Sequence, residues 1–286
     1  IQDGCDSYCA YCIIPYTRGR PRSRELDGVV DEARRLIDQG FREIVLTGIH
    51  LGFYGRELKP RLSLADSVRA IADLPGLGRL RISSLEGLEV DRALLDAMQH
   101  PAVCPHLHIP LQSGDPAVLE RMDRRYTPKL FAHMVDVVRE KLDEPAITTD
   151  VIVGFPGETD REFFNTMELI GKLRFSRLHV FPFSAREVTP AAEMADQVDP
   201  RVIKSRVTTL TELGDELAMQ WAERFVGRDV RVLFERRDHE GILHGYTDRY
   251  VPLRMPGGND HVEKVETVRA ARAQRNELVA EADVEA

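Results

Sequence analysis

The sequence has no run of about 20 apolar residues, which excludes a transmembrane helix, and it shows no basic segment followed by an apolar stretch of the signal-peptide kind. Only four of its 286 residues are cysteines, too few for the disulfide scaffold of a small secreted domain. It contains no internal repeat. The net charge of −8 argues against a protein that coats nucleic acid by bulk charge, although a local basic face is compatible with it. We therefore expect a cytoplasmic protein with no membrane partner.

Apolar residues make up 43% of the chain and charged residues 30%, as is typical of a globular protein that buries a core. A length of 286 residues accommodates one large domain and one small domain. The first residue is Ile1 rather than methionine. From this we expect a first strand that is cut short and an upstream domain that lies outside this sequence.

Short β-rich runs alternate with amphipathic stretches over the first three-quarters of the chain. This order is typical of βαβ units with a parallel sheet, and about five such units suit a partial barrel better than a closed eightfold one. Ile1 to Asp3 would be the remainder of a further strand, and Asp91 and Thr159 stand where helix N-caps are useful. The predicted strands are 43–47, 80–84, 107–109, 146–153 and 178–181, and the predicted helices are 26–39, 64–74, 91–99, 128–142 and 158–173.

A long helical pattern covers 200–225, and the hydrophobic pattern changes after it. Short alternating runs follow at close spacing, which predicts a small all-β barrel. We expect a large domain over 1–224, a small domain over 225–275 and an acidic, solvated tail over 276–286. The predicted strands of the small domain are 229–235, 242–246, 250–253 and 262–268.

Three cysteines, Cys5, Cys9 and Cys12, lie within eight residues of one another. On a helix or in a loop this spacing lets the three sulfurs converge on one centre, and thiolates suit zinc and iron–sulfur clusters. Three ligands with no nearby fourth indicate a cluster with one open iron, because a site that does chemistry keeps a position free. The alternative is a zinc site completed by Cys104 in a non-catalytic, zinc-stapled RNA-binding protein; otherwise Cys104 is a small inert core residue.

The C-x3-C-x2-C spacing, with Tyr11 before the third cysteine, resembles the radical S-adenosylmethionine (SAM) superfamily. The resemblance implies a [4Fe-4S] cluster on Cys5, Cys9 and Cys12, SAM chelated at the free iron, and a partial (β/α)6 barrel. It also implies no catalytic side chain beyond the cluster ligands. Thr47 and Gly48 end the second strand, where this superfamily contacts the SAM amino group, although a glycine after a strand is also an ordinary turn.

Further candidates for SAM contact follow from strand ends, because ligands of parallel sheets sit at the carboxyl ends of the strands. Gln112 and Ser113 end the fourth strand, with loop capping as the alternative role. Ile152 or Val153 would face the adenine of SAM. We expect His106, His108 and His179 to be hydrogen-bonded core residues, and Glu158 to begin a helix rather than to catalyse.

Longer motifs resemble the methylthiotransferases within this superfamily, and the last domain, with 245–251, resembles the RNA-binding TRAM domain. The motifs are 13–24, 106–114, 121–127 and 149–159; those at 47–55, 81–86 and 179–184, with 1–4, are similar to the branch that acts on N6-threonylcarbamoyladenosine of tRNA. One departure is Arg186-Glu-Val-Thr189, where that branch tends to have Arg-Pro-Gly-Thr. The alternative substrates are isopentenyladenosine of tRNA and an aspartate of a ribosomal protein.

The resemblance implies that one SAM yields a radical that abstracts hydrogen from adenine C2 and that another supplies the methyl group. It also implies tRNA, through its anticodon stem-loop, and an electron donor such as flavodoxin or ferredoxin as partners. A second [4Fe-4S] cluster is expected in the missing N-terminal domain. We therefore expect this chain to bind one cluster and to cleave SAM without completing methylthiolation alone.

Basic and aromatic residues mark the expected RNA contacts. A run of arginines without an intervening acid lies beside the cysteines and would meet phosphate or the SAM carboxylate. Residues 225–275 carry 10 Lys and Arg against 8 Asp and Glu, a balance of +2 within an acidic chain. Two tyrosines of this barrel could stack on bases or pack within it. The candidates are Arg18, Arg20, Arg22, Arg24, Arg124, Arg125, Tyr246 and Tyr250.

Overall fold

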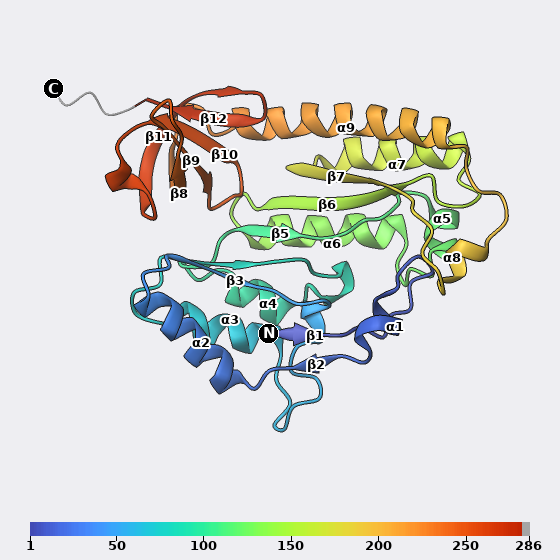
Figure 1. Ribbon diagram of the computed structural model, residues 1–286, viewed down its shortest axis with the longest axis horizontal. Helices are drawn as coiled ribbons and strands as arrows, with labels where there is room; N and C mark the ends of the chain where they lie inside the picture. The colour runs from blue at the N-terminus through green and yellow to red at the C-terminus, as the bar shows by residue number, and fades with distance from the viewer. Residues whose placement is uncertain (282–286) are drawn as a thin grey trace.

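A computed structural model describes residues 1–281 of the chain, so the end of the expected acidic tail, 282–286, lies outside the described residues. The described chain forms an open α/β barrel with a small β-barrel beside it (Figure 1). Within this part of the chain, no helix is both long enough and apolar enough to span a bilayer.

Parallel strands form the large domain in the order β1, β3, β4, β5, β6, β7. The pairs β3–β4, β5–β6 and β6–β7 are parallel, and isolated parallel bridges join β1 to β3 and β4 to β5. This open, six-stranded arrangement confirms the predicted partial barrel. The strands are β1 (Gln2–Asp3), β3 (Glu43–Leu46), β4 (Arg79–Ile82), β5 (His106–His108), β6 (Ala146–Val153) and β7 (Arg177–Pro182); β2 (Arg22–Ser23) pairs antiparallel with β1.

Helices cover the outer side of these strands (Figure 1). The predicted N-caps are confirmed: Asp91 accepts a hydrogen bond from the Leu94 amide at 2.8 Å, and Thr159 forms a capping box with Glu162. The longer helices are α2 (Leu26–Asp38), α3 (Leu64–Ala72), α6 (Pro128–Lys141), α7 (Asp160–Leu173) and α9 (Pro200–Glu223); the short ones are α1 (Ile14–Arg18), α4 (Arg92–Ala97), α5 (Pro116–Arg121) and α8 (Pro190–Glu193).

The apolar core of the large domain lies between the strands and the helices, not inside the barrel. On β6, Val151 and Val153 point to the helix side and are buried. Asp150 and Ile152 alternate with them, are only half-buried, and therefore line the inner side. The barrel consequently encloses a partly open, polar interior.

The small domain is a closed barrel whose strands follow one another in the order β10, β12, β11, β8, β9. This confirms the predicted all-β barrel. Phe234, Leu253 and Leu278 fill its centre. The strands are β8 (Asp229–Arg237), β9 (Ile242–Thr247), β10 (Pro252–Pro256), β11 (Val265–Gln274) and β12 (Glu277–Ala280).

The expectation of a solvated tail from residue 276 is wrong for β12. Its side chains Leu278 and Ala280 are buried, and the strand closes the barrel by pairing with β10 and β11. Glu277, which suggested solvent, instead pairs with Arg254 at 2.9 Å. Three consecutive apolar residues were too short a run to stand out among the acidic residues around them.

Buried arginines fix the small barrel against the amino-terminal ends of β3 and β4. Arg79 donates to the carbonyl oxygen of Tyr246 at 3.0 Å, and Arg81 donates to that of Thr247 at 3.1 Å. Glu43 on β3 pairs with both guanidinium groups. In Figure 1 the small barrel lies at the end of the large domain opposite to α1, which follows the cysteine loop. The small barrel and the cysteine loop therefore lie at opposite ends of the large domain.

Candidate active site

The three clustered cysteines lie in a loop between β1 and α1, not on a helix. Gly4 begins the loop with a φ of +77°, and a Cβ at this position would collide with the carbonyl oxygen of Arg20. Backbone hydrogen bonds hold the loop to three other segments: Cys5 to Gly19 at 3.0 Å, Ala10 to Met122 at 3.0 Å, and Ala191 to Ala10 at 2.9 Å. The loop is therefore fixed in place at the carboxyl-terminal end of the barrel.

Polar donors contact the sulfurs of Cys5 and Cys9. The Cys5 Sγ lies 3.3 Å from the His50 Nδ1 and accepts from the Ser7 amide at 3.4 Å. Burial opposes ionisation of Cys5, but these hydrogen bonds outweigh it and lower the pKa of the thiol. The Cys9 Sγ accepts from Arg124 at 3.2 Å, and burial raises the pKa of this thiol despite the guanidinium. Burial also raises the pKa of Cys12.

The arrangement of the sulfurs fits a cluster better than a single zinc ion. Two thiolates about 2.3 Å from one ion cannot lie more than about 4.6 Å apart. Among residues 1–281, the one set of three metal-type side chains whose donor atoms all lie within 4.8 Å of one another is elsewhere, and it contains no cysteine. The three thiols are nevertheless close enough that Cys5 and Cys9 each raise the pKa of Cys12. Three thiols in one short loop form a donor set that is chemically suited to a [4Fe-4S] cluster.

Cys104 does not complete the cysteine site. Its amide donates to the Leu80 carbonyl oxygen at 2.8 Å, at the amino-terminal side of the barrel, and its side chain is buried. Its charged neighbours are Arg81 and Arg79, and burial raises its pKa to about 11. This is the environment expected of an inert core thiol, and it removes the proposed fourth ligand from the zinc alternative.

Sequence reasoning missed a shell of charged residues around the cysteines. Glu89 holds His50 through contacts of 2.7 Å to its Nε2, and hydrogen bonds to Cys5 and Glu89 outweigh burial to raise the pKa of His50 to about 9. Arg124 pairs with Glu86. A cleft of about 220 Å³ beside Cys9 is lined by these side chains. Only the position of His50, just after Thr47 and Gly48 at a strand end, could have pointed to its role.

Arg124 was predicted to contact RNA, and the structure contradicts this. Its side chain is 5% exposed, donates to Cys9 and lies over the ring of Tyr126. A buried guanidinium that donates to Cys9 and pairs with Glu86 has no free face for a phosphate. Its neighbour Arg125 is exposed, as are Arg18, Arg20, Arg22 and Arg24, of which Arg22 and Arg18 face Asp3.

The residues predicted to contact SAM separate into two groups. Tyr11 and Ile152 belong to one apolar cluster, which brings the cysteine loop to the carboxyl-terminal end of β6. Gly48 pairs with Gln2 of β1, and a Cβ on it would come within 3.0 Å of Gln2. Gln112 has a φ of +62° and bridges to β6, and Thr47 is exposed. These five residues lie on or next to the inner side of the barrel.

The other two residues predicted to contact SAM have buried side chains. Val153 faces the helices and is part of the core, because it alternates with the inward-facing Ile152. Ser113 is fully buried, and its hydroxyl lies 3.2 Å from the Thr166 hydroxyl and accepts from the Asp115 amide. These hydrogen bonds agree with the loop-capping alternative.

The tyrosines of the small barrel are also engaged within the protein. Tyr250 stacks on His106 with ring centroids 4.9 Å apart, and Arg81 lies 4.9 Å from its ring centre. Tyr246 stacks on Tyr250 at 4.8 Å. Tyr250 is thus part of the contact between the domains, as in the packing alternative, and its half-buried ring also lines a cavity. Tyr246 is half-buried in the same stack.

The inner side of the barrel carries a hydrogen-bonded group on three adjacent strands. Asp150 Oδ1 lies 3.1 Å from His108 Nε2 and 3.1 Å from His179 Nδ1. Burial opposes ionisation of Asp150, but these two hydrogen bonds outweigh it and lower its pKa to about 2. His106 and His108 are buried and hydrogen-bonded, as expected for core residues, whereas His179 is half-exposed toward a cavity.

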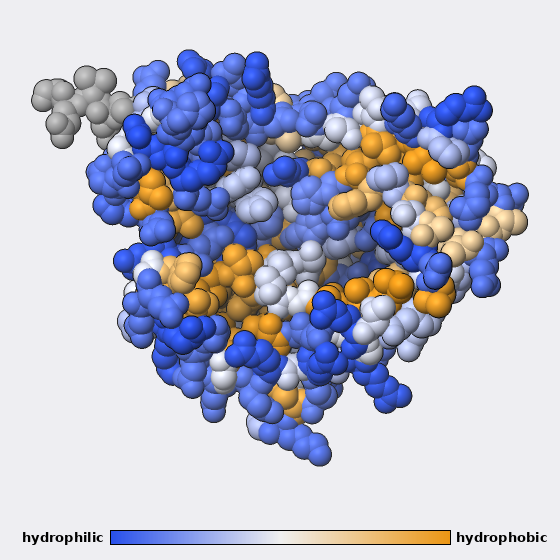
Figure 2. Space-filling model, viewed as in Figure 1, coloured by the Kyte–Doolittle hydropathy of each residue, from blue (hydrophilic) through white to orange (hydrophobic). Residues whose placement is uncertain are grey.

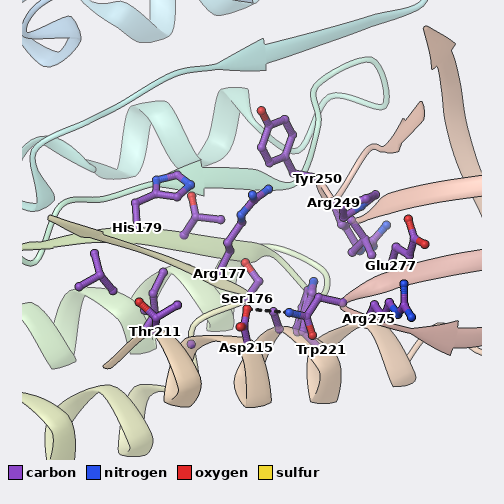
Figure 3. Close-up of a pocket in the computed structure, with 18 residues that line it drawn as sticks. Ser176, Arg177, His179, Thr211, Asp215, Trp221, Arg249, Tyr250, Arg275 and Glu277 are labelled. Carbon is purple, nitrogen blue, oxygen red and sulfur yellow. Dashed lines mark hydrogen bonds between the residues drawn. The ribbon is translucent and has the colours of Figure 1, made fainter. Parts of the chain in front are cut away.

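That cavity has a volume of about 440 Å³ and lies between β7, α9 and the small barrel. Figure 3 shows Arg177 and His179 pointing to one side of β7, while Thr211, Asp215 and Trp221 lie toward α9 on the other. In Figure 2, apolar patches line both rims of the opening between the two halves of the large domain. The interior is therefore open to the surface and has apolar edges around a polar wall.

Comparisons with known proteins identify two families in the chain. The Radical SAM superfamily matches residues 1–170, and the TRAM domain matches residues 223–282. Two solved structures share the fold: the radical SAM methyltransferase TsrM of Kitasatospora setae and coproporphyrinogen III oxidase (HemN) of Escherichia coli. TsrM has a TM-score of 0.56 at 20% identity, covering 67% of this chain and 36% of its own. HemN has a TM-score of 0.52 at 17% identity, covering 79% and 52%.

Curated relatives match almost the whole chain. It is 40% identical over 278 residues to the threonylcarbamoyladenosine tRNA methylthiotransferase MtaB of Bacillus subtilis, covering 96% of this chain and 62% of the relative. The MtaB of Thermotoga maritima is 39% identical, covering 94% and 62%. A tRNA-2-methylthio-N(6)-dimethylallyladenosine synthase of Acetivibrio thermocellus is 39% identical, covering 86% and 52%. The chain thus spans between about half and two-thirds of the length of these relatives.

Proposed function

The chain belongs to the radical SAM superfamily and carries a TRAM domain, and from this premise we propose that it is the SAM-cleaving and RNA-binding part of a tRNA methylthiotransferase. A [4Fe-4S] cluster and SAM are the cofactors of this superfamily. The observation that carries the proposal is the fixed loop that places Cys5, Cys9 and Cys12 together at the carboxyl-terminal end of the barrel.

The three cysteines are the residues that would hold the cluster, which supplies electron transfer and radical formation from SAM when both are bound. The chain itself positions and shields these cofactors. His50 and Arg124 place positive charge beside Cys5 and Cys9 and so favour their thiolate forms. Tyr11, Gly48, Gln112 and Ile152 line the adjoining inner wall, where SAM would be oriented and water excluded.

The RNA partner is proposed from the TRAM domain and the exposed arginines. Arg18, Arg20, Arg22 and Arg24 lie in the segment that follows the cysteine loop, so phosphates held there would lie beside the cofactors. We take tRNA, through its anticodon stem-loop, as the substrate, the cytoplasm as the compartment, and flavodoxin or ferredoxin as the electron donor.

The proposed target is C2 of N6-threonylcarbamoyladenosine next to the anticodon. The motif resemblance of Thr47 to Gly55 and of His179 to Ser184 supports this branch, as does a barrel wall that carries Asp150, His179 and Arg177. A wall of charged groups suits a polar substituent better than an isoprenoid one, because unpaired buried polar groups reject apolar ligands.

Deletion of the gene that encodes this chain tests the proposal. In tRNA from the deletion strain, mass spectrometry should show loss of 2-methylthio-N6-threonylcarbamoyladenosine and accumulation of its unmodified precursor. Complementation by the gene with Cys104→Ala should restore the product, and complementation with Cys9→Ala should not. Loss of the 2-methylthio form of isopentenyladenosine, with the threonylcarbamoyl product intact, would assign the chain to the other branch.

A further inference from the structure

Two strands place six side chains in three levels on the inner wall of the barrel. The register of β6 with β7 pairs Thr148 with Arg177, Asp150 with His179, and Ile152 with Phe181. Alternate residues of a strand share a face, so all six lie on the same side. The apolar level, Ile152 and Phe181, is nearest the cysteine loop, and the basic level, Arg177, is farthest from it.

Arg177 is an exposed cation at the edge of the cavity. Within residues 1–281 it takes part in no ion pair and donates no side-chain hydrogen bond. Figure 3 shows its guanidinium extending along the cavity toward Tyr250, on the same side of β7 as His179. A guanidinium presents parallel N–H donors in a plane, which is the geometry that a carboxylate accepts.

His179 offers a second donor next to Arg177. Its Nδ1 is engaged by Asp150, whose remaining hydrogen bond comes from His108, and His108 in turn contacts the Thr148 hydroxyl at 2.8 Å. The carboxylate of Asp150 therefore accepts its hydrogen bonds from these two histidines. The Nε2 of His179 has no hydrogen-bond partner in the described chain, and the half-exposed ring lines the cavity.

The donor atoms of His108, Asp150 and His179 also lie within 4.8 Å of one another, as a metal site would require. However, the Nε2 of His108 and the Nδ1 of His179 each lie 3.1 Å from the Oδ1 of Asp150, which is a hydrogen-bond distance. Thr148 completes the set. The group is thus satisfied as a hydrogen-bond network that fixes the orientation of His179.

We propose that Arg177 and His179 bind the carboxylate of an amino-acid substituent on N6 of the target adenosine. The inference rests on the proposed function and names the residues that would select its substrate class. A target base lying against Phe181, beside the SAM adenine expected at Ile152, would direct an N6 substituent toward His179 and Arg177. Along β7, His179 lies one level and Arg177 two levels from the apolar level, about 6.6 Å and about 13 Å away. A substituent a few bonds long therefore reaches His179 directly, and the long side chain of Arg177 spans the rest of the distance to its carboxylate.

Arg177 and His179 would also discriminate between adenosines that carry different N6 substituents. A carboxylate would receive charge-assisted hydrogen bonds from both side chains. An isoprenoid group would remove Arg177 and His179 from water without accepting a hydrogen bond from either, and this would weaken binding. The wall therefore favours an adenosine with an amino-acid substituent over one with an apolar substituent.

The test compares anticodon stem-loop RNAs on the reconstituted chain by fluorescence anisotropy. One RNA carries N6-threonylcarbamoyladenosine, a second carries its methyl ester, and a third carries unmodified adenosine. We expect the wild type to bind the acid about tenfold more tightly than the ester, because one charged contact contributes roughly that factor. Arg177→Gln and His179→Phe should abolish most of this difference, and Arg177→Lys should retain part of it.

Arg92→Gln is the matched control, because Arg92 is an exposed arginine of α4 that pairs only with Asp96. It should leave all three affinities unchanged, and circular dichroism should show that every variant remains folded. Equal binding of acid and ester by the wild type, or unchanged discrimination in Arg177→Gln and His179→Phe, would overturn the inference while leaving tRNA binding intact. If the wild type binds no anticodon stem-loop more tightly than an unrelated hairpin, the proposed function fails as well.

Discussion

Replacing Cys9 by alanine should reduce the iron content of anaerobically reconstituted protein from about four per chain to nearly none, because a cluster on three thiolates cannot be retained on two. Cys9 is the most buried of the three, and its sulfur receives the hydrogen bond from Arg124. Iron and sulfide assays, with the visible absorbance of the cluster, measure the effect.

Cys104→Ala is the control for this experiment. Cys104 is buried like Cys9, but it is hydrogen-bonded to Leu80 in another part of the barrel. Its variant should retain about four iron atoms per chain, as the wild type does. One tightly bound zinc in the wild type, lost equally in Cys9→Ala and Cys104→Ala, would contradict the account and favour a zinc-stapled RNA-binding protein.

Replacing Arg206 by alanine should lower the free energy of unfolding by about 3–5 kcal/mol, since it leaves a buried carboxylate without its cation. Glu158 accepts from Arg206 and from the Gly154 amide, both at 2.8 Å, and its side chain is 1% exposed. Burial raises the pKa of Glu158 even with the guanidinium present. The pair joins α9 to the loop that follows β6, so its loss should also loosen that wall of the site.

Urea denaturation followed by circular dichroism measures this change. Arg201→Ala is a suitable control, because Arg201 lies on the same helix, pairs with Asp199 and is 93% exposed. Its variant should change stability by less than about 0.5 kcal/mol. A loss below about 1 kcal/mol in Arg206→Ala would show that the ion pair is not required to hold the loop.

The order of the barrel could be predicted because its signals are local. Buried strands such as 146–153 are apolar runs bounded by turns, and long helices such as 128–142 carry an apolar face. The short helices α1, α5 and α8 were missed because they are too short to display a periodic pattern. β12 was missed because its apolar run is short and lies among acidic residues, and its pairing with β10 and β11 is a tertiary contact that the run itself does not reveal.

The cysteine motif could be found because its three residues are adjacent in the sequence. Its surroundings could not, since His50, Glu89 and Arg124 come from segments far apart in the chain. Val153 and Arg124 show why the role of a single residue is hard to predict from the sequence. Successive residues of a strand alternate between the core and the barrel interior, and an arginine in a basic run can be buried against a cysteine. Which residue of such a run faces the site is decided by tertiary packing.

The central claim is that three thiolates leave one iron of the cluster open to SAM, and electron paramagnetic resonance tests it most directly. The reconstituted protein is reduced and its spectrum is recorded with and without SAM, using Cys104→Ala as a matched sample. The account predicts that SAM alters the cluster signal in both proteins and that 5′-deoxyadenosine forms. A cluster signal unaffected by SAM, with no cleavage product, would contradict it.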